Sequence, residues 1–105
     1  MLENDPFAEI PSSYTVTLDP PVKYDGRDYR ELVLREPRAG EVRQADEQVR
    51  NGATMSNLRN REHHLIAKVS GVPFPVVEQA GVSRITLAMA YLNRFLAPAP
   101  ETSAS

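Results

Sequence analysis

The sequence contains no cysteine. This excludes disulfides, thiolate nucleophiles and thiolate metal sites, and it suits a reducing cytoplasm. No apolar run approaches the roughly 20 residues that a membrane-spanning helix needs. The N-terminus also lacks the basic-then-apolar order of a signal peptide. We therefore expect a soluble cytoplasmic protein.

Excess charge of either sign is almost absent. Twelve Lys and Arg residues stand against 14 Asp and Glu residues, which gives a formal net charge of −2. Such a chain has no long-range field that attracts nucleic acid or an anionic membrane. The charge balance therefore predicts neither nucleic acid nor membrane as a partner.

The usual signatures of an active site are also missing. The five glycines occur singly, so none forms a phosphate-binding loop, and no serine lies in a Gly-x-Ser-x-Gly motif. His63 and His64 are adjacent and lie about 100° apart around a helix, so they cannot bind one metal as histidines at i and i+4 do. We interpret both as solvated helix residues. The sequence predicts no enzyme, no catalytic residue, no cofactor and no metal site.

Polar, proline-rich ends enclose one short domain in this chain of 105 residues. We predict a flexible N-terminal arm at 1–13, in which Phe7 and Ile10 are the apolar residues able to dock. A disordered C-terminal tail is predicted at 97–105. Residues 14–96 form a single α+β domain, with a β-hairpin region at 14–36 and a helical region at 38–96.

The hairpin region shows the period-two alternation of half-buried strands. Apolar residues alternate with threonine from 14 to 18, and a return strand is predicted at 29–35. Asp25-Gly26 between them is a strong signal for a two-residue turn. Because proline has no backbone N–H, Pro20 and Pro21 are expected to interrupt the first strand.

The remaining chain predicts three to four helices. One helix is expected at 41–50, and a second, capped by Thr54 or Ser56, runs to about residue 70. A short third helix is expected at 76–80, and a last helix, capped by Ser83, reaches about residue 96. Since the sheet comes first and the helices follow, the fold class is α+β rather than alternating α/β.

The last predicted helix has an unusually broad apolar face. Such an arc covers about half of the helix, which is more than one neighbouring element needs. We predict that part of it binds another protein, and the alternative is that it is simply core. The candidate partner-binding residues are Leu87, Met89, Tyr91, Leu92, Phe95 and Leu96.

The segment from Gln79 to Ala88 resembles the turn and recognition helix of helix-turn-helix repressors. A DNA-binding regulator is therefore an alternative function. Against it, the following helix is mostly apolar, and Pro73 and Pro75 leave only about five residues for the first helix of such a motif. Glycine ending one helix and serine capping the next explains the segment better.

Several segments in order resemble the tail assembly chaperones of Mu-like contractile-tailed phages. They are a strand at 16–22, an Asp-Gly turn at 24–27, and a second strand followed by Glu-Pro-Arg-Ala-Gly-Glu at 32–41. The segments 65–73 and 91–96 also fit that family, so the resemblance covers about residues 14–96.

The resemblance implies a non-enzymatic chaperone that keeps the tape-measure protein of the tail soluble during morphogenesis. It also implies action in the cytoplasm of the bacterial host and absence from the mature virion. A longer, frameshifted form of the same protein is a further partner that the family implies, and a homo-oligomer is left open. A minor structural tail protein is the remaining alternative.

Overall fold

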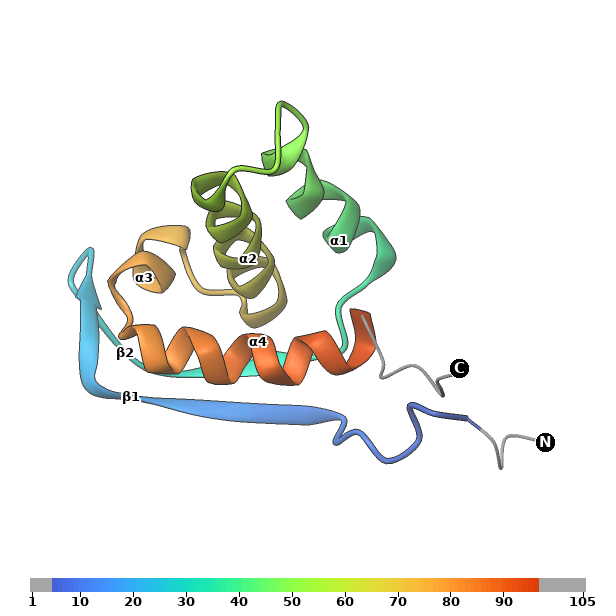
Figure 1. Cartoon of the computed structure of the whole chain (residues 1–105). Helices are drawn as coiled ribbons and strands as arrows, with labels where there is room; N and C mark the ends of the chain where they lie inside the picture. Colours follow the sequence, from blue (N-terminus) through green and yellow to red (C-terminus); the bar gives the residue numbers. More distant parts are fainter. Residues whose placement is uncertain (1–4, 97–105) are drawn as a thin grey trace.

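The computed structural model describes residues 5–96, which form a two-stranded antiparallel sheet followed by helices (Figure 1). This order confirms the predicted α+β class. The elements are β1 (Ser13–Tyr24), β2 (Arg27–Arg35), α1 (Ala39–Asp46), the 3-10 turn η1 (Glu47–Val49), α2 (Met55–Ser70), α3 (Phe74–Gln79) and α4 (Val82–Leu96).

A two-residue turn at Asp25 and Gly26 joins the strands, as predicted. Both residues have positive φ, 53° and 77°, the backbone conformation that a tight hairpin turn requires. Tyr24 pairs with Arg27 directly beside the turn. The turn therefore fixes the register of the hairpin.

The two prolines of β1 do not end the strand. β1 continues through them, and the register with β2 shifts between Thr17 and Val22, while the bond between Asp19 and Pro20 is cis. The predicted interruption is thus a bulge within one strand of 12 residues. The missing N–H groups of proline are tolerated because the ladder is broken only there.

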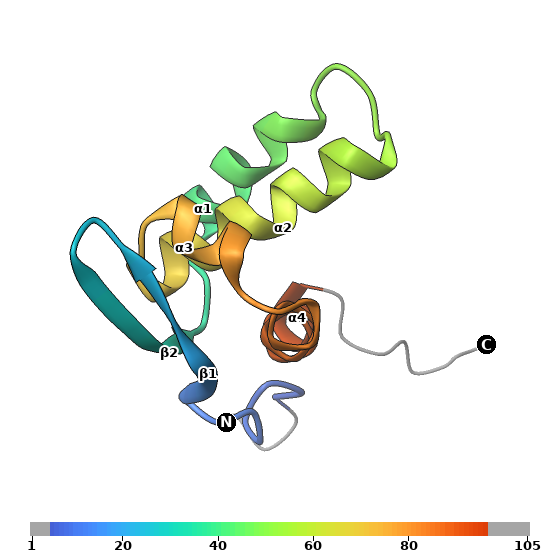
Figure 2. The ribbon, with the colours of Figure 1, turned by 90° about the vertical axis from the view of Figure 1, so that its left-hand side faces the viewer.

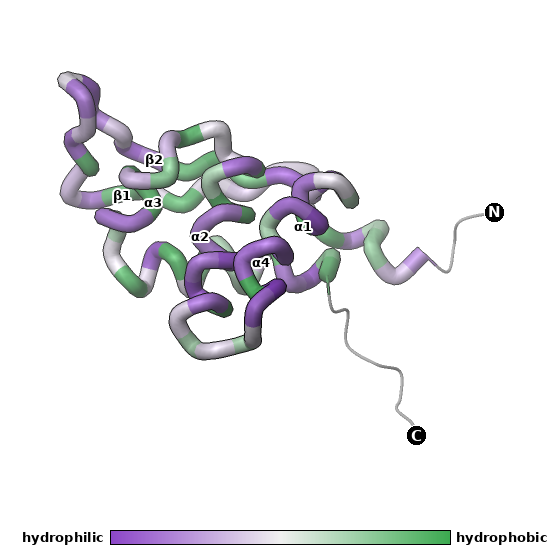
Figure 3. The backbone as a smooth tube through the Cα atoms, turned by 90° about the horizontal axis from the view of Figure 1, so that it is seen from above, coloured by the Kyte–Doolittle hydropathy of each residue, from purple (hydrophilic) through white to green (hydrophobic). Residues whose placement is uncertain are grey.

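One face of the hairpin is covered by helices (Figures 1 and 2). α4 runs along β1, α3 covers the strands near the turn, and the pair α1 and α2 rises away from the sheet. Seen from above, the tip of the hairpin projects past the helices (Figure 3). The buried apolar core consists of Val16, Leu18, Val22, Leu32, Leu34, Ala45, Leu65, Ile66, Val69, Val76, Val77, Ile85, Ala88, Met89, Tyr91 and Leu92.

The helix predicted at 41–50 is present, but its regular part is shorter. α1 begins at Ala39 and ends at Asp46, and the chain then tightens into η1, where the Arg50 N–H donates to the Glu47 carbonyl over 3.2 Å. Only Val42 and Ala45 pack on the core from this region, and so small an apolar stripe does not stabilise a longer helix.

Glu41 fixes the start of α1. Its carboxylate accepts two hydrogen bonds from Arg35, at 3.0 and 2.8 Å, and one from the Arg38 backbone N–H at 2.8 Å. The hydrogen bond from Arg35 is the main reason that the pKa of Glu41 falls from 4.5 to about 2. The pair joins the end of β2 to α1.

The predicted cap of α2 is confirmed, that of α4 is not, and α3 begins at Phe74 rather than at residue 76. Thr54 caps α2, since its hydroxyl accepts from the Asn57 N–H at 3.1 Å. The predicted cap Ser83 lies inside the first turn of α4, because the N–H groups of Arg84 and Ile85 donate to the Gly81 carbonyl at 2.9 and 3.2 Å. Glycine therefore precedes the helix, and α4 begins one residue before the predicted cap.

The described part of the N-terminal arm, residues 5–12, lies against α4. The Tyr91 hydroxyl donates to the Pro11 carbonyl at 2.6 Å, and the Phe7 and Phe95 rings stack with centroids 6.4 Å apart. Ile10 packs on the core beside them. Both apolar residues of the arm thus contact the domain, while the tail predicted at 97–105 lies outside the described residues.

Candidate binding groove

α4 separates the predicted partner-binding residues into three environments. Tyr91 and Leu92 are buried in the core of this single chain. Met89, 7% exposed, lies at the boundary between the core and a groove. The outer members of the set, Leu87 and Leu96, are each 38% exposed, and Phe95 is half-buried. The apolar face of α4 therefore serves mainly as core, with a remainder at its margins.

A groove runs along α4 on the side facing α2. It comprises two cavities of about 400 and 320 Å³, which share Glu62, Met89 and Asn93. We call this surface the α2–α4 groove. It exists because α2 crosses α4 steeply and then rises away from it (Figures 1 and 2), so the two helices leave a corner that side chains do not fill.

The floor of the α2–α4 groove is apolar and its walls are polar. Buried side chains form the floor: Leu65, Val77, Ile85 and Met89. The walls carry charges of both signs from Arg59, Arg61, Glu62, Glu78 and Asp46, together with Asn93. An apolar floor within a polar rim is the arrangement that binds one apolar stripe of an amphipathic segment.

Two exposed apolar side chains mark the ends of the groove. Val82, at the start of α4, is 76% exposed, and Leu96, at its end, is 38% exposed. Each lines one of the two cavities. Sequence reasoning named Leu96 but missed Val82 and all groove residues of α2. Val82 lies seven residues before Met89 and fourteen before Leu96, on the same side of α4. It was missed because the start of the helix was predicted at the cap Ser83.

His63 and His64 are not the solvated pair that the sequence suggested. His63 contacts the Glu78 carboxylate and thereby links α2 to α3 at the wall of the groove. The His64 ring stacks on Phe74 with centroids 4.4 Å apart, and burial is the main cause that lowers the pKa of His64. Both rings help to fix α3 against α2, a packing role that adjacent histidines do not reveal in sequence.

Leu87 lies on the opposite side of α4, next to the arm. A shallow cavity of about 240 Å³ separates it from Pro11 and Tyr14. The Tyr14 and Tyr91 rings stack there with centroids 5.3 Å apart, and burial raises the pKa of Tyr91. Since the chain's own arm already occupies much of this side, less apolar surface remains here than in the groove.

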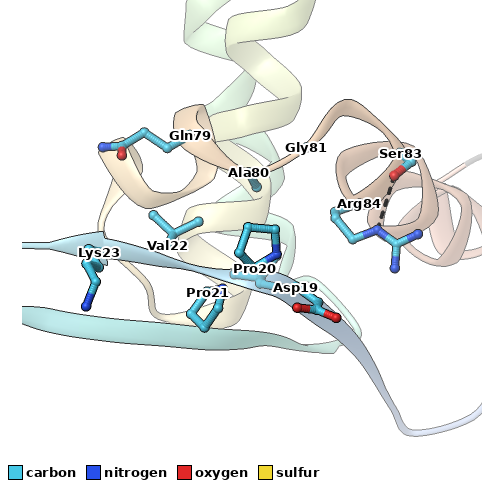
Figure 4. A pocket seen from close by; sticks show the side chains of 11 residues that line it. Asp19, Pro20, Pro21, Val22, Lys23, Gln79, Ala80, Gly81, Ser83 and Arg84 are labelled. Carbon is cyan, nitrogen blue, oxygen red and sulfur yellow. Dashed lines mark hydrogen bonds between the residues drawn. The ribbon is translucent and has the colours of Figure 1, made fainter.

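A cavity of about 550 Å³ lies where the β1 bulge meets the turn between α3 and α4 (Figure 4). Pro20, Pro21 and Val22 line it from β1, while Gln79, Ala80 and Arg84 line it from the helices. Its depth comes from the bulge, which moves the strand away from the turn. The buried Leu18 and Val22 line it together with prolines and polar groups.

The Gln79 to Ala88 segment is partly exposed, but its exposed side chains include the apolar Val82 and Leu87. Its first half lines the cavity beside β1, and Ile85 and Ala88 are buried. α3 has only six residues. Arg84 is the single basic residue of the segment. A recognition helix needs an exposed polar face directed at base edges, which this arrangement does not offer.

Within residues 5–96, no three His, Asp or Glu side chains lie close enough together to bind a metal ion. No helix of the same range has the length and apolar character needed to cross a bilayer.

The comparison with protein families gives one match. The model of the family described as phage tail assembly chaperone proteins, E, or 41 or 14, matches residues 15–97. That range covers all but the first two residues of the hairpin and every helix of the described residues. Neither the curated proteins nor the solved structures yielded a match to this chain.

Proposed function

Because the chain belongs to the phage tail assembly chaperone family, we propose that its client is the tape-measure protein and that it keeps this client soluble until the tail is assembled. The α2–α4 groove is the proposed client site. The role is one of binding, without catalysis. It takes place in the cytoplasm of the bacterial host, and the chaperone is absent from the mature virion.

The observation that carries the proposal is a groove lined below by apolar side chains, with an exposed apolar residue at each end, Val82 and Leu96. α4 is 15 residues long, so the groove beside it extends for about 20 Å. That length fits about four turns of a client helix. Val82 and Leu96 lie where the ends of such a helix would lie, and Met89 lies midway.

The chemistry of the client explains why such a groove is useful. A long helical protein that is not yet packed exposes an apolar stripe, and exposed stripes associate with one another. A groove with an apolar floor covers one stretch of the stripe, while its polar walls face the polar flanks of the same helix. Several copies of the chaperone along one client would cover successive stretches.

The proposed residues of α4 now divide into three groups. Leu96 and Met89 contact the client directly, together with Val82. Tyr91 and Leu92 support α4 from beneath, and Leu87 and Phe95 lie on the side that the arm covers. Client binding therefore depends on the α4 residues that line the groove more than on Tyr91 and Leu92, which are buried.

Co-expression with the tape-measure protein of the same genome tests the proposal. We expect the wild-type chain to keep the client in the soluble fraction and to co-purify with it. Val82→Asp combined with Leu96→Asp places charge at both ends of the groove. Because both side chains are exposed, we expect this variant to retain its fold. Its affinity for the client should fall at least about tenfold.

Met55 provides a matched control for that variant. It is 66% exposed at the start of α2 and does not line the groove. Met55→Asp therefore introduces the same kind of change elsewhere and leaves client binding intact. Equal loss in both variants, or recovery of the chain in purified particles, contradicts the proposal.

Salt dependence separates client binding from the DNA-binding alternative. Charges of both signs surround the groove, so apolar contact supplies most of the affinity. We expect the affinity for the client to change by less than about threefold between 0.1 and 0.5 M salt. A DNA-binding protein loses affinity steeply over that range because phosphate contacts release counterions. Retention on duplex DNA with such a slope would contradict the proposal.

A further inference from the structure

The outer edge of β2 is open. Within the described residues the sheet has two strands, and β2 pairs with β1 alone. Figure 2 shows β2 at the outer margin of the molecule, with β1 between it and α4. The half of β2 next to the turn, residues 27–31, belongs to the projecting tip, and four of its five residues are exposed. An open, extended edge pairs readily with another strand.

The turn determines which backbone groups face that edge. A two-residue hairpin loop is closed by a hydrogen-bonded pair, and pairs then alternate along the ladder. Since Tyr24 and Arg27 flank the turn and Val22 lies opposite Tyr29, Tyr29 directs its N–H and carbonyl toward β1. Asp28 and Arg30, on either side of it, direct theirs to the open edge.

Two-fold symmetry permits few ways to pair this edge with itself. In an antiparallel pair, neighbouring residue pairs alternate between hydrogen-bonded and non-hydrogen-bonded types. A two-fold axis must therefore pass through a residue that lies opposite its own copy. Centres at Arg27, Asp28, Arg30 or Glu31 would place like charges directly opposite, which is destabilising. Tyr29 is the single uncharged residue among these five.

The charges around Tyr29 are self-complementary. With Tyr29 opposite its copy, Arg27 lies opposite Glu31 of the second copy, and Asp28 lies opposite Arg30 of the second copy. The two-fold axis repeats both pairs, so every charged residue of 27–31 faces an opposite charge. The outward backbone groups of Asp28 and Arg30 pair in the same register.

We propose that a second copy of this chain pairs with the open edge of β2, antiparallel and centred on Tyr29, and joins two hairpins into a four-stranded sheet. This interface is separate from the α2–α4 groove, which remains open in both copies. A dimer of this kind presents two client sites. The inference does not depend on the identity of the client.

A centre at Val33 is the competing register. Val33 is 45% exposed, and Glu31 would lie opposite Arg35 of the second copy. However, Arg35 already forms a two-pronged pair with Glu41 at 3.0 and 2.8 Å, and this end of β2 continues directly into α1. Self-pairing there requires that the pair opens, whereas pairing at Tyr29 leaves it intact. Asp28 also has partners in its own chain, Lys23 at 3.0 Å and Arg30 at 3.5 Å. These pairs are more exposed than that of Arg35 and Glu41.

Sedimentation of the full chain tests the dimer. A five-residue edge buries a small area, so we expect a dissociation constant on the order of tens of micromolar. Glu31→Lys places Lys opposite Arg27 at both ends of the interface and weakens the dimer at least about tenfold. The double variant Arg27→Glu with Glu31→Arg restores opposite charges and restores the dimer. A strict monomer at 1 mM, or a dimer that Glu31→Lys does not weaken, overturns the inference.

Because the chain has no cysteine, a single introduced cysteine can test the register of the pairing by disulfide cross-linking. Cys at position 29 faces its own copy across a non-hydrogen-bonded pair, where Cα atoms lie about 4.5 Å apart, within the range for a disulfide. Tyr29→Cys is therefore expected to form a covalent dimer on mild oxidation, and Val33→Cys is not. Cross-linking of Val33→Cys instead overturns the Tyr29 centre. If Tyr29→Cys does not fold, the exposed charge variants decide alone.

Discussion

The two sides of α4 differ in how completely they are covered. Toward the sheet, Ala88 and Leu92 have no exposed surface and Tyr91 is 4% exposed. Toward α2, the exposed Val82 and Leu96 lie at the ends of an open groove. One helix thus holds the domain together on one side and leaves apolar surface on the other. The breadth of an apolar face alone does not show which part packs in the core and which part is left for a partner. The geometry of the neighbouring helices does.

The largest expected change in stability comes from a substitution on the side of α4 that faces the sheet. Leu92→Ala leaves a cavity beneath α4 and should lower the free energy of unfolding by about 2–5 kcal/mol. Urea denaturation monitored by circular dichroism measures it. Residual folded protein should still bind the client, because Leu92 does not line the groove. Full stability of this variant would contradict the assignment of Leu92 to the core.

A smaller effect is expected where the arm covers α4. The Phe95 ring contacts Tyr91 edge-on, with centroids 5.4 Å apart, and stacks on Phe7. Phe95→Ala should cost about 2 kcal/mol, below the range for a fully buried Phe, because the ring is half-buried. Phe7→Ala removes one of the two contacts and should cost less. A larger loss for Phe7→Ala than for Phe95→Ala would reverse this order.

The pair between Arg35 and Glu41 tests a contact away from the groove, where the end of β2 meets α1. The folded-state pKa of Glu41 is about 2, below its ordinary 4.5, so the carboxylate contributes stability above about pH 4.5. This contribution is lost as pH falls toward 2. Since the Arg35 side chain is 37% exposed, solvent screening reduces it to about 1 kcal/mol. Glu41→Gln should lose that amount at pH 7 in thermal or urea unfolding.

The stability difference between wild type and Glu41→Gln should then shrink steadily between pH 4.5 and pH 2. A difference that stays constant across this window would mean that Glu41 acts through packing rather than through its charge.

The smallest effect concerns the cap of α2, whose first turns rise away from the sheet. Thr54→Ala removes the hydroxyl that accepts from the Asn57 N–H and should cost about 0.5–1 kcal/mol. Ser56→Ala is the matched control, because the sequence allows either residue as the cap and Ser56 lies inside the helix. Equal losses in the two variants would contradict the assigned cap.

The elements that could be predicted from sequence are those set by local chemistry. Asp25-Gly26 demands its turn, Gly71 ends α2 with a φ of 77°, and alternation along 14–18 predicts the face that is buried. The errors arose where tertiary contacts decide. Periodicity locates the apolar face of α4 but not its neighbours, so it could not separate Leu92 from Leu96. The groove depends on how steeply α2 crosses α4, and no local pattern carries that angle.

The central claim is that the client lies in the α2–α4 groove. A single cysteine at Thr86, which is exposed and lines the groove, can carry a photo-crosslinker in a chain that has no other cysteine. A cysteine at Thr17, exposed on the outer face of the sheet, is the control. In complex with the tape-measure protein, we expect cross-links from position 86 and none from position 17. Cross-links from position 17 alone would contradict the groove as the client site.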